Sequence, residues 1–145
     1  MIQHVAHIGL TVSNLEQSIQ FYQNIVGLTY VNQMKMNGKN TDALFQKENC
    51  EAKVAYLQPK DGGALIELIQ FTSHPVQLDR TNLFRTSISE ICFTCDDIQA
   101  EYERLKALGV QFLSSPQFFD YGSTKSYAVY FYDLDGNILE MMQSL

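Results

Sequence analysis

Two glutamates stand in the middle of apolar stretches that have the character of strands. Glu67 lies within Leu-Ile-Glu-Leu-Ile at 65–69, and Glu140 lies within Ile-Leu-Glu-Met-Met at 138–142. Because side chains alternate along a strand, each carboxylate points away from its apolar neighbours. Burying such a charge is costly unless it is paired or bound to a metal. The two positions therefore predict carboxylates that are paired or bound to a metal. The alternative is that both lie on the water-facing side of an antiparallel sheet.

An internal repeat adds a second pair of candidates. Residues 7–15 read His-Ile-Gly-Leu-Thr-Val-Ser-Asn-Leu, and residues 90–98 read Glu-Ile-Cys-Phe-Thr-Cys-Asp-Asp-Ile. Each segment is a strand, then a short polar pair that can cap a helix, then the start of an amphipathic helix. His7 and Glu90 occupy the same position of the repeat, as do Glu67 and Glu140. The repeat thus predicts one imidazole and three carboxylates at matching places.

The elements around these residues repeat in the same order. Ser13 and Glu16 are spaced as a capping box, and Gly27 and Gly109 are expected to end the two helices. New strands are predicted at 28–31 and 110–113, and two hairpins follow, with turns at 59–63 and 133–137. The pattern in each half is therefore strand, helix, strand, strand, strand.

This order predicts an α+β fold of two tandem βαβββ modules. We expect a single domain over residues 1–145, with modules at 1–72 and 85–145 joined by a linker at 73–84. The modules are expected to form a curved mixed eight-stranded sheet, a half-barrel cup with the helices outside. The middle of the cup is the natural ligand site.

Composition narrows the class of protein. The net charge of −6 argues against a nucleic-acid partner, because phosphate binding needs a basic surface. No apolar run is long enough to cross a membrane, and residues 1–10 lack the pattern of a secretion signal. We therefore expect a cytoplasmic protein.

The three cysteines do not predict a disulfide framework. Cys92 and Cys95 form a C-x-x-C pattern, but their spacing on a strand directs the two thiols to opposite faces. No second C-x-x-C pair is present to complete a zinc site. The interpretation favoured for all three, Cys50 included, is ordinary packing as small hydrophobic side chains.

Taken together, these motifs resemble the vicinal oxygen chelate superfamily, which includes glyoxalase I, methylmalonyl-CoA epimerase, extradiol dioxygenases and fosfomycin- or bleomycin-resistance proteins. The resemblance covers almost the whole chain. It rests on these segments: His7-Ile-Gly-Leu-Thr-Val-Ser-Asn-Leu, Ser18, Phe21-Tyr22, Val26-Gly27-Leu28, Ile66-Glu67-Leu68 and Asp133-Leu134-Asp135-Gly136-Asn137-Ile138-Leu139-Glu140.

The resemblance implies one divalent metal ion held by His7, Glu67, Glu90 and Glu140. The position of Glu90 is usually histidine in the enzymes of the family, so this chain departs from them there. A third carboxylate makes the ligand set more anionic, which favours hard ions such as Mn²⁺ or Mg²⁺ while leaving Ni²⁺ or Zn²⁺ open. It also weakens the pull of the metal on substrate oxygen.

The implied function is that of a glyoxalase I-like lyase or isomerase, which acts on a small substrate with two adjacent oxygens through an enediolate. Either Glu140 or Glu67 would take the proton, and the other would return it. The alternative is a non-catalytic protein that binds an antibiotic or another hydrophobic ligand in the same cup. The resemblance also implies a homodimer, with the site either within one chain or shared between two.

Two further features lie near the expected cup. Residues 118–123 combine aromatic side chains with a glycine turn, and are interpreted either as a substrate lid or as a plain connection between strands. Tyr127 and Tyr130 are candidates for the cavity wall, with ordinary packing as the alternative.

Overall fold

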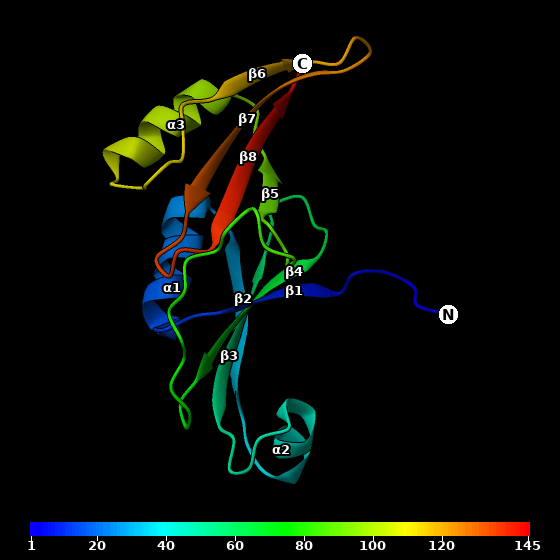
Figure 1. The fold of residues 1–145 in the computed structure, drawn as a ribbon, viewed down its shortest axis with the longest axis vertical. Helices are drawn as coiled ribbons and strands as arrows, with labels where there is room; N and C mark the ends of the chain where they lie inside the picture. Colours follow the sequence, from blue (N-terminus) through cyan, green and yellow to red (C-terminus); the bar gives the residue numbers. More distant parts are fainter. The chain divides into compact units, whose positions relative to one another are not determined.

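His7 lies on the strand parallel to that of Glu67, and Glu90 directly precedes the strand parallel to that of Glu140. The computed structural model describes all residues, 1–145, and divides them into two compact units, Met1–Leu78 and Asp79–Leu145. Each unit contains one open four-stranded sheet (Figure 1). In each sheet the first strand of the unit lies parallel to the last one, and the other pairings are antiparallel.

The first unit has strand order β1-β4-β3-β2. Its elements are β1 His7–Thr11, α1 Leu15–Phe21, the single π-helical turn η1 Tyr22–Val26, β2 Thr29–Met36, α2 Lys39–Phe45, β3 Ala52–Gln58 and β4 Leu65–Phe71.

The second unit has strand order β5-β8-β7-β6, which is the same arrangement. Its elements are β5 Ile91–Thr94, α3 Ile98–Ala107, β6 Gln117–Asp120, β7 Lys125–Tyr132 and β8 Ile138–Ser144. None of the helices in either unit has the length and apolar character that a bilayer span requires.

The α+β class and the two βαβββ modules predicted from the sequence are confirmed, and the eight strands fall into two sheets of four. Three details differ from the prediction. Residues 110–113 form only an isolated bridge, Phe112 to Phe131, and the strand that follows α3 is β6. Residues 118–120 belong to a paired edge strand, so neither the substrate lid nor the plain connection describes them. The short helix α2 was not expected.

Alternation along the strands separates a buried face from an accessible one. In β4, Ile66 and Leu68 are fully or almost fully buried, and in β8 so are Leu139 and Met141. These side chains point opposite to the two central glutamates, as predicted. In the first unit α1 contacts β3 and β4, and in the second α3 contacts β8. The helices thus cover the apolar face and leave the glutamate face open.

Both helix starts are anchored by a glutamine from the last strand of their unit. The Leu15 amide donates to the Gln70 side chain over 2.9 Å, and the Ile98 amide donates to Gln143 over 3.0 Å. The N-cap residues are Asn14 and Asp97, whose side chains accept from the amides of Gln17 and Ala100. The predicted cap at Ser13 is therefore displaced by one residue. The glutamines fix each helix against its sheet.

Replacing either glutamine by alanine is expected to destabilise the chain by about 1 kcal/mol, because a half-buried helix amide loses its acceptor. Urea denaturation monitored by circular dichroism measures this change. Gln70→Glu and Gln143→Glu keep an oxygen acceptor near a helix N-terminus and should retain most of the stability. Equal losses in the alanine and glutamate variants would contradict the capping role.

The turn between β7 and β8 is built around a buried carboxylate. Asp133 is only 8% exposed and accepts hydrogen bonds from the amides of Asp135 and Asn137 and from the Asn137 side chain. Gly136 has φ of +85°, and a Cβ there would lie 2.7 Å from Cγ of Arg80. A side chain at this position would therefore meet both backbone strain and a clash. The turn fixes the start of β8, the strand that carries Glu140.

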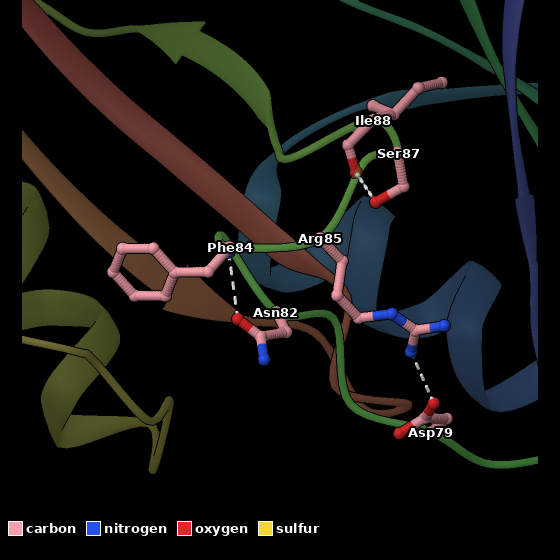
Figure 2. Close-up of polar contacts among 6 residues, drawn as sticks. All are labelled: Asp79, Asn82, Phe84, Arg85, Ser87 and Ile88. Atoms are coloured by element: carbon pink, nitrogen blue, oxygen red, sulfur yellow. Dashed lines mark hydrogen bonds and ion pairs between the residues drawn. The ribbon is translucent and has the colours of Figure 1, made fainter.

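The segment that opens the second unit is held by local polar contacts (Figure 2). Asn82 accepts from the Phe84 amide over 2.9 Å, and Arg85 pairs with Asp79 over 2.7 Å. The Phe84 side chain is almost fully exposed. Because both members of the ion pair are more than half exposed, the pair contributes little stability.

Candidate functional site

In the first unit, His7 and Glu67 converge from the parallel strands β1 and β4. His7 Nε2 lies 3.4 Å from Glu67 Oε2, and the glutamate side chain is only 12% exposed against 44% for the histidine. The register places Gly9 opposite Glu67, so His7, two residues earlier, lies on the same face of the sheet. The structure thus brings these two predicted ligands together.

Tyr56 is a third member of this group. It lies opposite Glu67 in the β3–β4 hairpin, and its hydroxyl donates to Glu67 Oε1 over 2.5 Å. Its ring meets His7 edge-on, with centroids 5.7 Å apart. The hydrogen bond to Glu67, with burial and the negative charge of that carboxylate as smaller causes, raises the pKa of Tyr56 to about 12. Tyr56 therefore stays a hydrogen-bond donor that holds one oxygen of Glu67.

Glycine at position 9 leaves space beside Glu67. A Cβ added to Gly9 would lie 3.2 Å from Glu67 Oε2, which is closer than ordinary contact. Glu67 cannot move away easily, because the Tyr56 hydroxyl holds its other oxygen. The small residue thus keeps the oxygen that faces His7 accessible.

In the second unit, the position equivalent to Gly9 is Cys92. Cys92 lies opposite Glu140 in the β5–β8 pair, as Gly9 lies opposite Glu67. Partial burial first, and then a hydrogen bond to Glu140 and the charges of Glu140, Glu90 and Cys95, raise the pKa of the Cys92 thiol to about 12. The thiol is therefore a neutral neighbour of two predicted ligands. The expectation that Cys92 packs as a buried hydrophobic residue is wrong, because its side chain is exposed.

Tyr130 repeats the position of Tyr56. It lies opposite Glu140 in the β7–β8 hairpin, and burial followed by the charges of Glu140, Glu90 and Cys92 raises its pKa. Together with Glu140 it lines a hollow of about 470 Å³ on the accessible face of this sheet, which Phe119 and Tyr121 also line. The rings of Phe119 and Tyr121 stack within 3° of parallel. Tyr127 instead packs against Phe118. Of the two tyrosines proposed from the sequence, only Tyr130 lines this hollow.

The structure thus brings His7 together with Glu67 in one unit. In the other unit it places Glu140 opposite Cys92, and Glu90 directly precedes β5. No group of three or more histidine, cysteine, aspartate or glutamate side chains is assembled as a metal site. Sequence reasoning missed Tyr56 and Cys92. The two tyrosines could have been found from the hairpins. Pairing residues at equal distances from each turn places Tyr56 opposite Glu67 and Tyr130 opposite Glu140.

The raised pKa of Cys92 predicts slow alkylation. At pH 8 a thiol of pKa about 12 has a thiolate fraction on the order of 10³-fold below that of an unperturbed cysteine. Glu140→Gln removes the hydrogen-bonded carboxylate, so the pKa should fall and the rate of reaction with iodoacetamide should rise by about fivefold or more. Peptide mass mapping gives the rate at each cysteine.

Cys95 is the internal control for this measurement. Burial and the charges of Glu101, Asp96 and Asp97 raise its pKa, and Glu140 does not contribute. Its rate should therefore be the same in the wild type and in Glu140→Gln. Fast labelling of Cys92 in the wild type at pH 8 would contradict the contact with Glu140.

The His7 nitrogen and the Glu67 oxygen fit a divalent metal in type and spacing. Two ligand atoms bound at about 2.1 Å to one ion, at 90–110° to each other, lie about 3.0–3.4 Å apart. The 3.4 Å between His7 Nε2 and Glu67 Oε2 agrees with this spacing. Imidazole nitrogen and carboxylate oxygen are both ordinary ligands of Mn²⁺, Ni²⁺ or Zn²⁺. The first unit can therefore supply two ligands to one ion without rearrangement of that pair.

Known proteins share this sequence pattern and fold. The family model described as Glyoxalase/Bleomycin resistance protein/Dioxygenase superfamily matches residues 4–141. A protein of Shewanella frigidimarina is 27% identical over 143 residues, which are 99% of this chain and 95% of that protein. The crystal structure of a glyoxalase family protein from Bacillus cereus has a TM-score of 0.86 at 20% identity and covers all of this chain and 96% of its own.

A fosfomycin resistance protein from Listeria monocytogenes is also similar in fold. Its crystal structure has a TM-score of 0.67 at 22% identity, and the match covers all of this chain and 96% of that one. At this level of identity the likeness concerns the fold, whereas the family model spans nearly the whole sequence, including His7, Glu67, Glu90 and Glu140. The chain belongs to the glyoxalase/bleomycin resistance protein/dioxygenase superfamily.

Proposed function

We propose that the protein is a metal-dependent lyase or isomerase that resembles glyoxalase I, with His7, Glu67, Glu90 and Glu140 as ligands of one divalent ion. The observation that carries the proposal is the repeated register. Glu67 and Glu140 each lie opposite the residue two places after His7 and Glu90, on the accessible face of their sheets. Two carboxylates in equivalent places, each on the face that the helices of its own unit leave open, support the proposal that each supplies a metal ligand.

The two glutamates have different surroundings, which suggests different roles. Tyr56 holds one oxygen of Glu67 by a hydrogen bond, so Glu67 is the better fixed ligand. Glu140 lies at the wall of the 470 Å³ hollow, beside a neutral thiol. We infer that Glu140 takes the proton from substrate carbon, while Glu67 can return it on the other side. The metal, when bound, would stabilise negative charge that develops on two adjacent substrate oxygens.

Glu90 distinguishes this chain from the family's usual ligand set. With three carboxylates and one imidazole, the ligands carry one more negative charge than a dication can neutralise. Oxygen-rich ligation favours Mn²⁺ or Mg²⁺ over softer ions, with Ni²⁺ and Zn²⁺ as alternatives. Glu90→His should therefore shift the metal preference toward Zn²⁺ or Ni²⁺.

We also infer a homodimer. The edge strand β2 is exposed along nearly its whole length and presents Tyr30, Val31 and Met34. Exposed edges of this kind are commonly covered by pairing with another chain.

The second candidate is a binding protein without catalysis. The hollow of the second unit favours it, because apolar and aromatic side chains make up much of its wall and suit an apolar ligand. Phe119 and Tyr121 would contact such a ligand, and Glu140 would be its polar anchor.

The metal content of the purified protein, prepared without chelator, separates the two candidates. About one divalent ion per chain, together with turnover of the methylglyoxal–glutathione hemithioacetal, supports the enzyme. Absence of metal together with tight binding of an apolar ligand supports the binding protein and overturns the metal site.

A further inference from the structure

A hollow other than the one beside Glu140 lies in the first unit, separate from the His7–Glu67 pair. Its volume is about 440 Å³, within the range of small-molecule sites. It is lined by Thr11, Phe45, Lys47, Cys50, Phe71 and the segment 74–77. Thr11 ends β1 and Phe71 ends β4, four residues beyond His7 and Glu67 on the same strands. At about 3.3 Å per residue, the hollow lies roughly 13 Å along the sheet from the candidate metal ligands.

Its apolar wall is made by two aromatic rings. Phe45, the last residue of α2, meets Phe71 edge-on with centroids 5.0 Å apart. Cys50, which also lines the hollow, is almost fully buried. The loop that leads to Cys50 is held by Asp42, which accepts from the amides of Asn49 and Cys50. The wall therefore combines the end of α2, the end of β4 and a loop that hydrogen bonds to Asp42 hold in place.

The polar groups of the hollow are cationic or neutral. Lys47 and His74 are the only titratable nitrogen bases among the lining residues, and no carboxylate lines it. This contrasts with a chain in which acidic residues outnumber basic ones by 16 to 10. His74 is oriented by Ser73, whose Oγ lies 2.7 Å from His74 Nδ1. Ser73 is itself fixed, since its hydroxyl oxygen accepts from the Glu51 amide over 2.8 Å.

We propose that this hollow binds a small organic carboxylate with an apolar or aromatic body. The body would lie against Phe45 and Phe71, and the carboxylate would pair with Lys47 and accept a hydrogen bond from the ring of His74. A charged hydrogen bond of this kind favours the anion over a neutral isostere of the same shape. The proposal does not rest on the proposed function, because neither His7 nor any glutamate takes part in it.

Phenylacetate and its neutral isostere phenylacetamide are suitable probes. Each is titrated into the full-length protein in the presence of EDTA, so that no metal contributes, and binding is followed by amide chemical shifts. Phenylacetate is expected to shift the signals of Cys50, His74 and Val76, and to bind at least tenfold more tightly than phenylacetamide. Lys47→Gln should remove this preference, whereas Lys39→Gln, on the same helix–loop segment but outside the hollow, should keep it.

The size of the apolar wall gives a second test. Phe45→Ala should weaken both probes by a similar factor, because the ring contacts the part that they share. Equal affinity of the two probes for the wild type would overturn the proposal. So would a preference that survives Lys47→Gln, shifts confined to the hollow that contains Glu140, or no saturable binding of phenylacetate at all.

Discussion

Glu140→Gln is expected to lower hemithioacetal turnover by about 10²–10⁴-fold, the usual contribution of a positioned proton-transfer group. Glutamine preserves the size of the side chain and an oxygen that can approach a metal, but it cannot accept the substrate proton. The change should therefore affect kcat more than KM. Steady-state kinetics with equal metal loading of both proteins measures it.

Glu103→Gln is the matched control, because Glu103 is an exposed residue of α3 whose weak contact with Gln99 lies outside the hollow. Its turnover should equal that of the wild type. Unchanged turnover in Glu140→Gln would remove Glu140 from the proton-transfer role, and Glu67 would then be the remaining carboxylate for that step.

Asp133→Ala is expected to give the largest loss of stability among the polar substitutions, about 2–4 kcal/mol. The buried carboxylate accepts three hydrogen bonds, two of them from backbone amides of its own turn. Alanine leaves these donors without acceptors, and the turn that starts β8 loses its anchor. Chemical denaturation gives the free energy of unfolding.

Asp61→Ala is the control for this change, because Asp61 lies in the corresponding turn of the first unit and is exposed. Its effect should stay within about 0.5 kcal/mol. Asp133→Asn keeps an acceptor for the amides of Asp135 and Asn137 and should fall between the wild type and alanine. A loss in Asp133→Ala no greater than that in Asp61→Ala would show that the turn forms without its carboxylate.

The fold was predictable because its signals are local and are repeated. The same order of strand, capped helix and glycine stop occurs twice, and Gly27 and Gly109 indeed adopt positive φ after their helices. Alternation along β4 and β8 correctly placed Glu67 and Glu140 opposite their buried neighbours. These features depend on residues that are close in the sequence, so they can be predicted from a single sequence without knowledge of strand pairing.

The parts that were missed depend on contacts between strands. Tyr56 is an ordinary strand aromatic until the hairpin register places its hydroxyl against Glu67. Cysteine is typical of protein cores, yet the parallel pairing of β5 with β8 places Cys92 beside the carboxylate of Glu140. Residues 110–113 are apolar enough for a strand, but Phe112 makes only an isolated bridge to Phe131, and the continuous pairing with β7 begins at Gln117.

The proposed function requires His7, Glu67, Glu90 and Glu140 to bind one divalent ion. Paramagnetic broadening of amide signals by substoichiometric Mn²⁺ tests it most directly in the full-length protein. We predict that a single population of Mn²⁺ broadens the signals around His7 and Glu67 and those around Glu90 and Glu140 together, at the same concentrations. Broadening of only one of these groups, or of acidic surface residues elsewhere, would contradict a shared site.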